Sequence, residues 1–111
     1  MEFSITNCAD YSLIKISRRI DGYTTPYLRE ALNDLISNSH TSLVVDMKDV
    51  PYIASTGILM FVNLQKRLLG QNEGEIVFAE THKLVLSSFE LAGFEIFFNF
   101  FEDISSAVDS F

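Results

Sequence analysis

Short apolar segments alternate with longer amphipathic stretches along this chain. Residues 3–5 and 13–16 alternate between apolar and polar side chains, which predicts two strands. Residues 43–45 are apolar without alternation, as is typical of a strand covered on both faces. Residues 75–79 and 96–98 predict two more strands. The pattern therefore indicates five strands.

Apolar side chains recur at helical spacing in four stretches that follow these strands. The first helix is expected to be capped by Thr25 and to hold Pro26 in its first turn, where a missing N–H costs nothing. The second covers residues 58–69, and the third ends at Gly93. Asp103 opens the fourth helix.

The resulting order is ββαβαβαβα. Strands that alternate with helices predict an α/β fold, with a small, mixed but mostly parallel β-sheet packed with about four α-helices. The chain has 111 residues, enough for one hydrophobic core, and it contains no linker or repeat. We therefore expect a single domain that covers residues 1–111.

Composition and charge narrow the class of function. Hydrophobic residues make up 48% of the chain, which predicts a folded globular protein. The formal net charge is -7, and neighbouring basic residues occur only at Arg18-Arg19 and Lys66-Arg67, which argues against binding to nucleic acid. No apolar run approaches the ~20 residues of a membrane span. We expect a cytoplasmic protein without membrane insertion.

Enzyme signatures are missing from the sequence. It contains no Gly-rich phosphate loop, no paired nucleophile and base, and no metal-ligand spacing. The single cysteine, Cys8, cannot form an intrachain disulfide. The pattern favours a non-catalytic binding module that needs no cofactor.

Ser55-Thr56-Gly57 is the strongest candidate for a functional site, because it stands where the second helix should begin. The first turn of a helix leaves N–H groups unpaired, and its dipole favours negative charge. Ser55 could therefore simply cap the helix, or it could carry a phosphate that the same N–H groups stabilise. The residues alone favour the cap.

The order of several segments resembles the anti-sigma factor antagonist family of STAS domains. Residues 19–26 resemble its second strand, acidic turn and first helix, and residues 43–50 resemble its central strand and following loop. Residues 55–57 are similar to its Asp-Ser-Ser/Thr-Gly phosphorylation motif, and residues 91–97 to its third helix and last strand. One position departs from the motif, since Ala54 stands where the family usually has Asp.

The resemblance implies a phospho-switch. The unphosphorylated protein would bind a GHKL-type Ser/Thr kinase that is also the anti-sigma factor, and would release the protein which that factor holds captive. Phosphorylation at Ser55 would switch it off, with Thr56 as a minor site, and a PP2C-type phosphatase would reset it. Ala54 removes a carboxylate that would repel the phosphate, and with it a possible contact to a partner.

The resemblance also implies a partner-binding surface at Asp21, Ser55, Thr56 and Gly57. Asp21 could instead be a simple turn former, and Gly57 could serve close packing of the helix rather than the approach of a partner.

Thr56, Met60 and Asn63 are spaced along one stripe of the second helix, and we expect Met60 to be an exposed, adaptable contact. The competing interpretation is an ordinary solvated helix face.

A second hypothesis belongs to another class of function. The domain could be a permanent structural subunit of a transport or signalling assembly, without regulation by phosphate. Ala54 favours this hypothesis, whereas the intact Ser-Thr-Gly motif and the acidic charge argue against it.

Overall fold

A five-stranded sheet forms the centre of the computed structural model, which describes residues 3–111. Its strands follow one another in space in the same order as in the sequence. The strands are β1 (Phe3–Asn7), β2 (Ser12–Ile16), β3 (Ser42–Asp46), β4 (Glu75–Ala79) and β5 (Asn99–Phe101). β1 and β2 form an antiparallel hairpin, and every other neighbouring pair is parallel.

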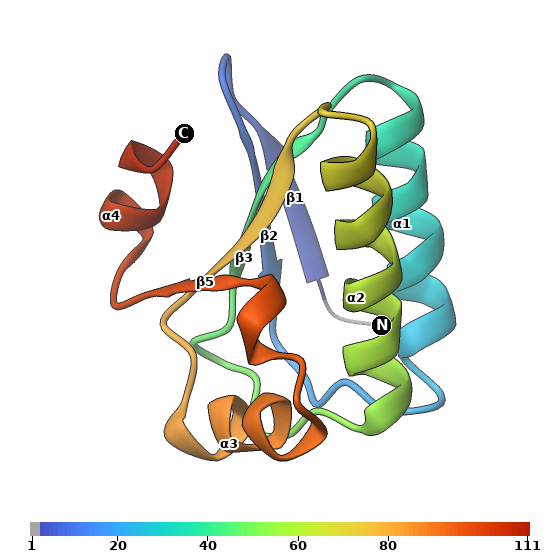
Figure 1. The fold of residues 1–111 in the computed structure, drawn as a ribbon, viewed down its shortest axis with the longest axis vertical. Coiled ribbons are helices and arrows are strands. Elements are labelled where there is room, and N and C mark those ends of the chain that lie inside the picture. The colour runs from blue at the N-terminus through green and yellow to red at the C-terminus, as the bar shows by residue number, and fades with distance from the viewer. Residues whose placement is uncertain (1–2) are drawn as a thin grey trace.

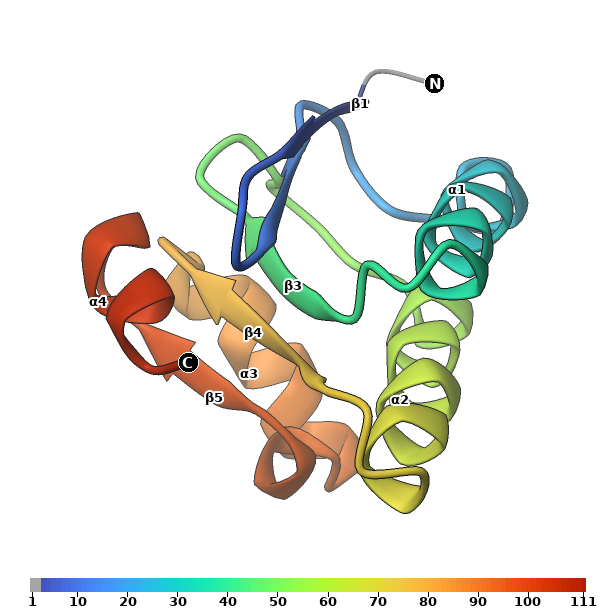
Figure 2. The same ribbon diagram turned by 90° about the horizontal axis from the view of Figure 1, so that it is seen from above.

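Four α-helices cover the two faces of this sheet unequally (Figures 1 and 2). The helices α1 (Thr25–Ser37), α2 (Ser55–Gly70) and α3 (Lys83–Ala92) pack on one face, and α4 (Ile104–Asp109) packs on the other. The predicted order and the α/β class are therefore confirmed.

The central strands are buried on both faces because helices cover both. Leu43 and Val45 of β3 belong to the large core under α1, α2 and α3. Val44, between them, packs with Ala107 of α4 on the opposite side. Side chains alternate along a strand, so an apolar run without alternation requires two covered faces, and α4 provides the second one.

Phe78 on β4 is the hub of the aromatic core. Its ring lies 5.0 Å from that of Phe61 and 5.4 Å from that of Phe89, measured between ring centroids. Phe98 and Phe100 lie at 5.0 Å and 5.2 Å from it. These spacings suit edge-to-face and offset aromatic pairs, which stabilise a core beyond the burial of area alone.

The last strand lies later in the chain than the apolar pattern predicts. Residues 96–98 are not a strand, because Glu95–Phe97 form a 3₁₀ turn, labelled η1, and β5 begins at Asn99. Gly93 ends α3 in a left-handed conformation with φ of 78°, as predicted. The chain then needs one more turn before Phe98 can enter the aromatic core and β5 can pair with residues 77–79.

The start of α1 also differs from the prediction. Thr24, not Thr25, occupies the position before the helix, and neither side chain caps its first turn. Thr25 is buried, and its hydroxyl donates a 2.6 Å hydrogen bond to the carbonyl oxygen of Asp21. Thr25 thus ties the helix back to the preceding turn.

Gln65 anchors α2 to the sheet. Its side chain is buried, and its Nε2 donates to the carbonyl oxygens of Ile76 and Phe97 at 3.1 and 2.9 Å. Its Oε1 accepts from the amide of Ile76 at 2.7 Å. A buried amide with its donors and acceptor all engaged holds the helix in one register on β4, and so helps to position the N-terminus of α2.

Candidate functional site

The predicted residues Asp21 and Ser55 lie at the end of the sheet where the parallel strands terminate. Asp21 follows β2, and the segment that leads to Ser55 follows β3. A short parallel bridge joins these two loops, in which the amide of Ile20 donates to the carbonyl oxygen of Tyr52 at 2.9 Å. The amide of Ala54 donates in return to the carbonyl oxygen of Ile20 at 2.8 Å. The bridge therefore brings the Asp21 turn beside the first turn of α2.

Ser55 is the first residue of α2 and its side chain is exposed. The residue before the helix, which normally provides a cap, is Ala54, with extended backbone angles. Within residues 3–111 no side chain makes a capping hydrogen bond to this helix. The interpretation of Ser55 as a helix cap is therefore wrong, because its position is one residue too late. Its hydroxyl stands at the positive end of the helix dipole, open to solvent.

Asp21 shapes the turn beside it. Its Oδ1 accepts hydrogen bonds from the amides of Tyr23 at 3.0 Å and Thr24 at 3.1 Å. Its Oδ2 lies 3.1 Å from Nε of Arg19. The hydrogen bond from the Thr24 amide, together with that from Tyr23, outweighs desolvation and lowers the pKa of Asp21 below its ordinary value. The carboxylate stays charged, and the turn-forming role is present in the structure.

Gly57 is buried against the bridge that joins the two loops. A Cβ atom at this position would lie 2.6 Å from Cγ2 of Ile20 and 3.1 Å from Cγ1 of Ile53. Only a residue without a side chain allows α2 to approach the bridge so closely. The geometry therefore favours close packing as the reason for glycine here.

Met60 is not exposed, contrary to the prediction. Its relative exposure is 2%, and it forms the floor of a groove between α1 and α2. Arg29 from α1 and Asn63 from α2 also line this groove. α1 packs alongside α2 and covers the Met60 side chain, and helix periodicity within α2 alone does not reveal that neighbour. Thr56 and Asn63 of the predicted stripe are exposed.

The charge and apolar pattern did not single out three exposed tyrosines, of which Tyr23 lies in the Asp21 turn and Tyr52 in the bridge to Ile20. Tyr23 is 88% exposed, Tyr27 63% and Tyr52 47%, and Leu59 lies one turn along α2 from Ser55 with 46% exposed. The guanidinium of Arg19 lies 5.2 Å from the centre of the Tyr52 ring. Tyrosine and arginine are enriched in protein interfaces. The sequence contained this signal, because Tyr27 falls outside the apolar stripe of α1 and Tyr23 lies in the polar turn before that helix.

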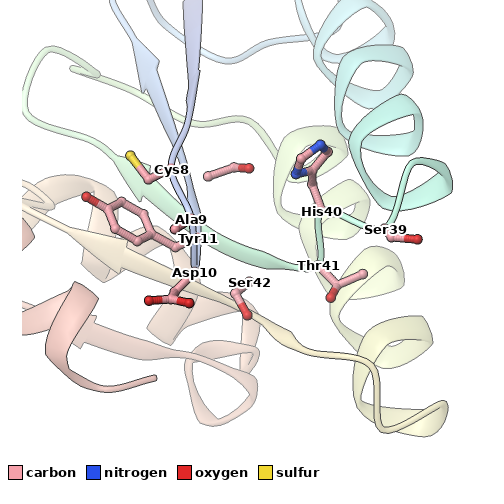
Figure 3. Close-up of a pocket in the computed structure, with 9 residues that line it drawn as sticks. Cys8, Ala9, Asp10, Tyr11, Ser39, His40, Thr41 and Ser42 are labelled. Atoms are coloured by element: carbon pink, nitrogen blue, oxygen red, sulfur yellow. The ribbon is translucent and has the colours of Figure 1, made fainter.

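A second pocket lies at the opposite end of the sheet (Figure 3). It is lined by the turn between β1 and β2 and by the segment between α1 and β3, including Cys8, Tyr11 and His40. The Cys8 side chain beside the Tyr11 hydroxyl raises the pKa of Tyr11. No predicted site residue lines this pocket.

Residues 3–111 contain no group of three or more His, Cys, Asp or Glu side chains that could hold a metal ion. In the same range, every helix is too short or too polar to cross a membrane.

The family follows from comparison with known proteins. Residues 5–107 match the STAS domain family. The chain belongs to the STAS family. It is 30% identical over 80 residues to an anti-sigma-B factor antagonist of Staphylococcus aureus, which covers 72% of this chain and 73% of that protein. This similarity places the chain among the anti-sigma factor antagonists.

Solved structures of this STAS fold superimpose closely. An anti-sigma factor antagonist from Mycobacterium paratuberculosis has a TM-score of 0.87 at 20% identity, over 98% of this chain and 92% of that chain. The phosphorylated form of SpoIIAA, a Bacillus cell fate determinant, has a TM-score of 0.75 at 12% identity, over 98% of both chains. At such low identity these structures show the shared fold alone.

Proposed function

We propose that this STAS protein is a phospho-switch that acts on an anti-sigma factor. In its unphosphorylated form it binds a GHKL-type Ser/Thr kinase that is also the anti-sigma factor, and it releases the protein which that factor holds. The kinase phosphorylates Ser55, with Thr56 as a minor site, and the complex dissociates. A PP2C-type phosphatase removes the phosphate. The chain itself performs no catalysis, and the cycle takes place in the cytoplasm.

One observation carries this proposal. In a member of the anti-sigma factor antagonist family, Ser55 presents an exposed hydroxyl at the N-terminus of α2 and caps nothing. The hydroxyl therefore has no structural duty that a phosphate would disturb. The neighbouring amides of α2 and the helix dipole stabilise a phosphate at this point, so modification leaves the fold intact.

The surroundings of Ser55 suggest why a phosphate would end binding. A phosphate adds about -1.5 to -2 charges at neutral pH. The proposed partner surface consists of Asp21, Tyr23, Tyr52, Ser55 and Leu59, which combine a negative charge with exposed aromatic and apolar area. A phosphate dianion inside such an interface would lose its hydration and would be repelled by the carboxylate of Asp21. An unpaired buried charge costs about 3–5 kcal/mol, so binding would be weakened by an amount of this order.

Ala54 adjusts this switch without removing it. An Asp at position 54 would cap α2 and place a second carboxylate next to the phosphate. With Ala54 the phosphate meets less repulsion inside the protein. We expect the free-energy cost of phosphorylating Ser55 to be lower with Ala54 than with Asp at this position. We also expect the first turn of α2 to be less stable before phosphorylation, because Ala54 cannot cap it.

Binding to the partner kinase tests the proposal. Pull-downs from the native host, followed by isothermal titration with the kinase that they identify, would compare wild type with Ser55→Ala and Ser55→Asp. Wild type and Ser55→Ala should bind, and Ser55→Asp should lose affinity at least tenfold. Ser105→Asp is the matched control, because Ser105 is also an exposed serine in the first turn of a helix, but on α4 at the other face of the sheet.

The outcomes separate the two classes of function. Retention of the same partners by wild type, Ser55→Ala and Ser55→Asp would contradict the switch, and would favour a permanent structural subunit. A loss of binding in Ser105→Asp as large as in Ser55→Asp would show that added charge, rather than its position, is responsible.

A further inference from the structure

The outer face of α3 carries two strongly exposed leucines. Leu91 is 90% exposed and Leu84 is 77% exposed, while Val85 and Phe89 on the inner side of the same helix are buried. Leu84 and Leu91 lie seven residues apart, which places them on one stripe of the helix, with Ser87 between them. Figure 1 shows α3 at the lower edge of the molecule.

We propose that a second copy of this chain docks on this face, through antiparallel pairing of the two α3 helices about a two-fold axis near Ser87. Leu84 of each copy then packs on the partner's Leu91. A two-fold interface requires that if residue i contacts residue j, residue j contacts residue i. Leu84 and Leu91 lie equally far from the midpoint between Ser87 and Ser88, so one arrangement about that midpoint satisfies both contacts.

The small side chain in the middle of the stripe allows close approach. Ser87 is only partly exposed and lies where the two helices would cross. Leucines at the two ends and a serine at the centre let the helices come together at the crossing point while each leucine covers its counterpart. This arrangement removes from water the two leucines that α3 exposes in the monomer.

The charges beside the stripe select the antiparallel orientation. Lys83 and Glu90 are also seven residues apart, and helical geometry puts both on the same edge of the Leu84–Leu91 stripe. In the antiparallel pair, Lys83 of each copy meets the partner's Glu90. A parallel two-fold pair would put this edge of the two copies on opposite sides of the interface, so these two ion pairs would not form.

The helix dipoles favour the same orientation. α3 has no acidic residue in its first turn and no basic residue in its last turn. Antiparallel pairing supplies both, because the partner's Glu90 comes near the N-terminal end and the partner's Lys83 near the C-terminal end. On the α3 stripe, the charge of Lys83 offsets that of Glu90, although each copy carries a net charge of -7. The inference rests on α3 alone and is independent of phosphorylation at Ser55.

Sedimentation analysis of the purified full chain tests the pairing. The wild type should shift from 12.6 kDa towards twice that mass as its concentration rises. Leu91→Asn should raise the dimer dissociation constant by about a hundredfold, because two copies of the leucine are lost from the interface. Leu69→Asn is the matched control, since Leu69 is a half-exposed leucine on α2, and it should leave association unchanged.

A single species of 12.6 kDa at every concentration up to about 1 mM would overturn the proposal, because a specific interface should be populated below that range. Equal weakening by Leu69→Asn and Leu91→Asn would also overturn it. Circular dichroism would confirm that each variant is folded, as expected for substitutions at exposed positions.

Charge exchange tests the orientation. Lys83→Glu and Glu90→Lys should each weaken association about tenfold, since each leaves like charges face to face. The double variant Lys83→Glu/Glu90→Lys restores opposite charges and should return to within a few-fold of wild type. A double variant as weak as the single ones would overturn the antiparallel arrangement.

Disulfide crosslinking through a cysteine near the proposed axis tests the arrangement of the two helices independently. In a Cys8→Ser background, Ser87→Cys should form a covalent dimer under mild oxidation, because the two sulfur atoms come close only at the axis. Ser105→Cys on α4 is the control and should remain monomeric. Crosslinking of Ser105→Cys at the same rate would show random collision and would contradict the pairing.

Discussion

The amide of Ala54 donates a 2.8 Å hydrogen bond to the carbonyl oxygen of Ile20. This contact, with its partner between Ile20 and Tyr52, couples the loop that holds Asp21 to the loop that leads into α2 at Ser55. The two loops come from different strand ends, so neither alone defines the surface. A disturbance of the bridge should therefore move both halves of the proposed partner surface together.

Gly57→Ala should destabilise the protein through this bridge. The new methyl group would meet Cγ2 of Ile20 at 2.6 Å. Overpacking costs about 1–3 kcal/mol, while replacing glycine in a helix returns up to ~1 kcal/mol, so we expect a net loss of about 1–2 kcal/mol. Urea denaturation measures it.

Gly70→Ala is the matched control for this experiment. Gly70 is the last residue of the same helix, and a Cβ there would have nothing within 4 Å. This variant should be neutral or more stable by up to ~1 kcal/mol. If Gly57→Ala gained as much as Gly70→Ala, close packing would not be the reason for glycine at position 57.

Ala54→Asp should stabilise the unphosphorylated protein. Position 54 precedes α2 with φ of -85° and ψ of 163°, the backbone angles of a capping residue. An Asp there accepts from free amides of the first turn and complements the dipole, which contributes about 0.5–2 kcal/mol. Thermal or urea unfolding would show the gain.

Ala54→Asn separates the two contributions in that variant. It adds the cap without the charge, so it should keep most of the gain. Phosphorylation at Ser55 should then destabilise Ala54→Asp more than Ala54→Asn, because only Asp repels the phosphate. Identical responses of the two variants would argue against electrostatic adjustment at position 54.

Acid should weaken the fold partly through two carboxylates. The hydrogen bond from the Thr24 amide lowers the pKa of Asp21, and that from the Ser106 amide lowers the pKa of Asp103. A group with a lowered pKa in the folded state contributes stability above its unfolded pKa, near 3.8 for Asp, and loses it as the pH falls through the folded value. Stability should therefore drop below about pH 4.

The variants Asp21→Asn and Asp103→Asn identify these contributions. Each should flatten the acid limb of the curve of unfolding free energy against pH, because Asn does not titrate in this range. The residues lie on different elements, so the double variant should show the sum of the two changes. Asp10→Asn, an exposed turn residue, is the control. An unchanged acid limb in the double variant would contradict these roles.

Tyr23→Ala should affect a partner more than it affects the fold. Tyr23 is 88% exposed, so its loss should change stability by less than about 0.5 kcal/mol. In the proposed complex an aromatic anchor at this place is worth about 2 kcal/mol, or roughly thirtyfold in affinity. Calorimetric titration against the partner kinase measures it, and an affinity equal to wild type would remove Tyr23 from the interface.

Periodicity predicted the elements whose environment is set by their own residues. The run at residues 43–45 revealed both its strand and its two covered faces, and Gly93 marked the end of α3 correctly. The helix at residues 104–109 begins after Asp103, whose side chain accepts from the amide of Ser106 at 2.7 Å. In each case local chemistry and global packing favour the same structure.

Features set by a distant neighbour were not predictable in the same way. Met60 looks exposed on its own helix, but it is buried in the core, beside the groove between α1 and α2. The final strand begins one turn late because Phe98 must enter the cluster around Phe78. The link between Ile20 and Ala54 joins residues far apart in the chain, and no sequence periodicity encodes it.

The exposed tyrosines have a consequence for optical measurements. The chain has four tyrosines and no tryptophan, so tyrosine dominates its near-ultraviolet emission. Tyr23 lies in the Asp21 turn and Tyr52 in the bridge that joins this turn to the start of α2, while Tyr11 lies at the far end of the sheet. The protein therefore carries a built-in fluorophore at its candidate site, and a change in its emission can follow phosphate transfer or partner capture without any label.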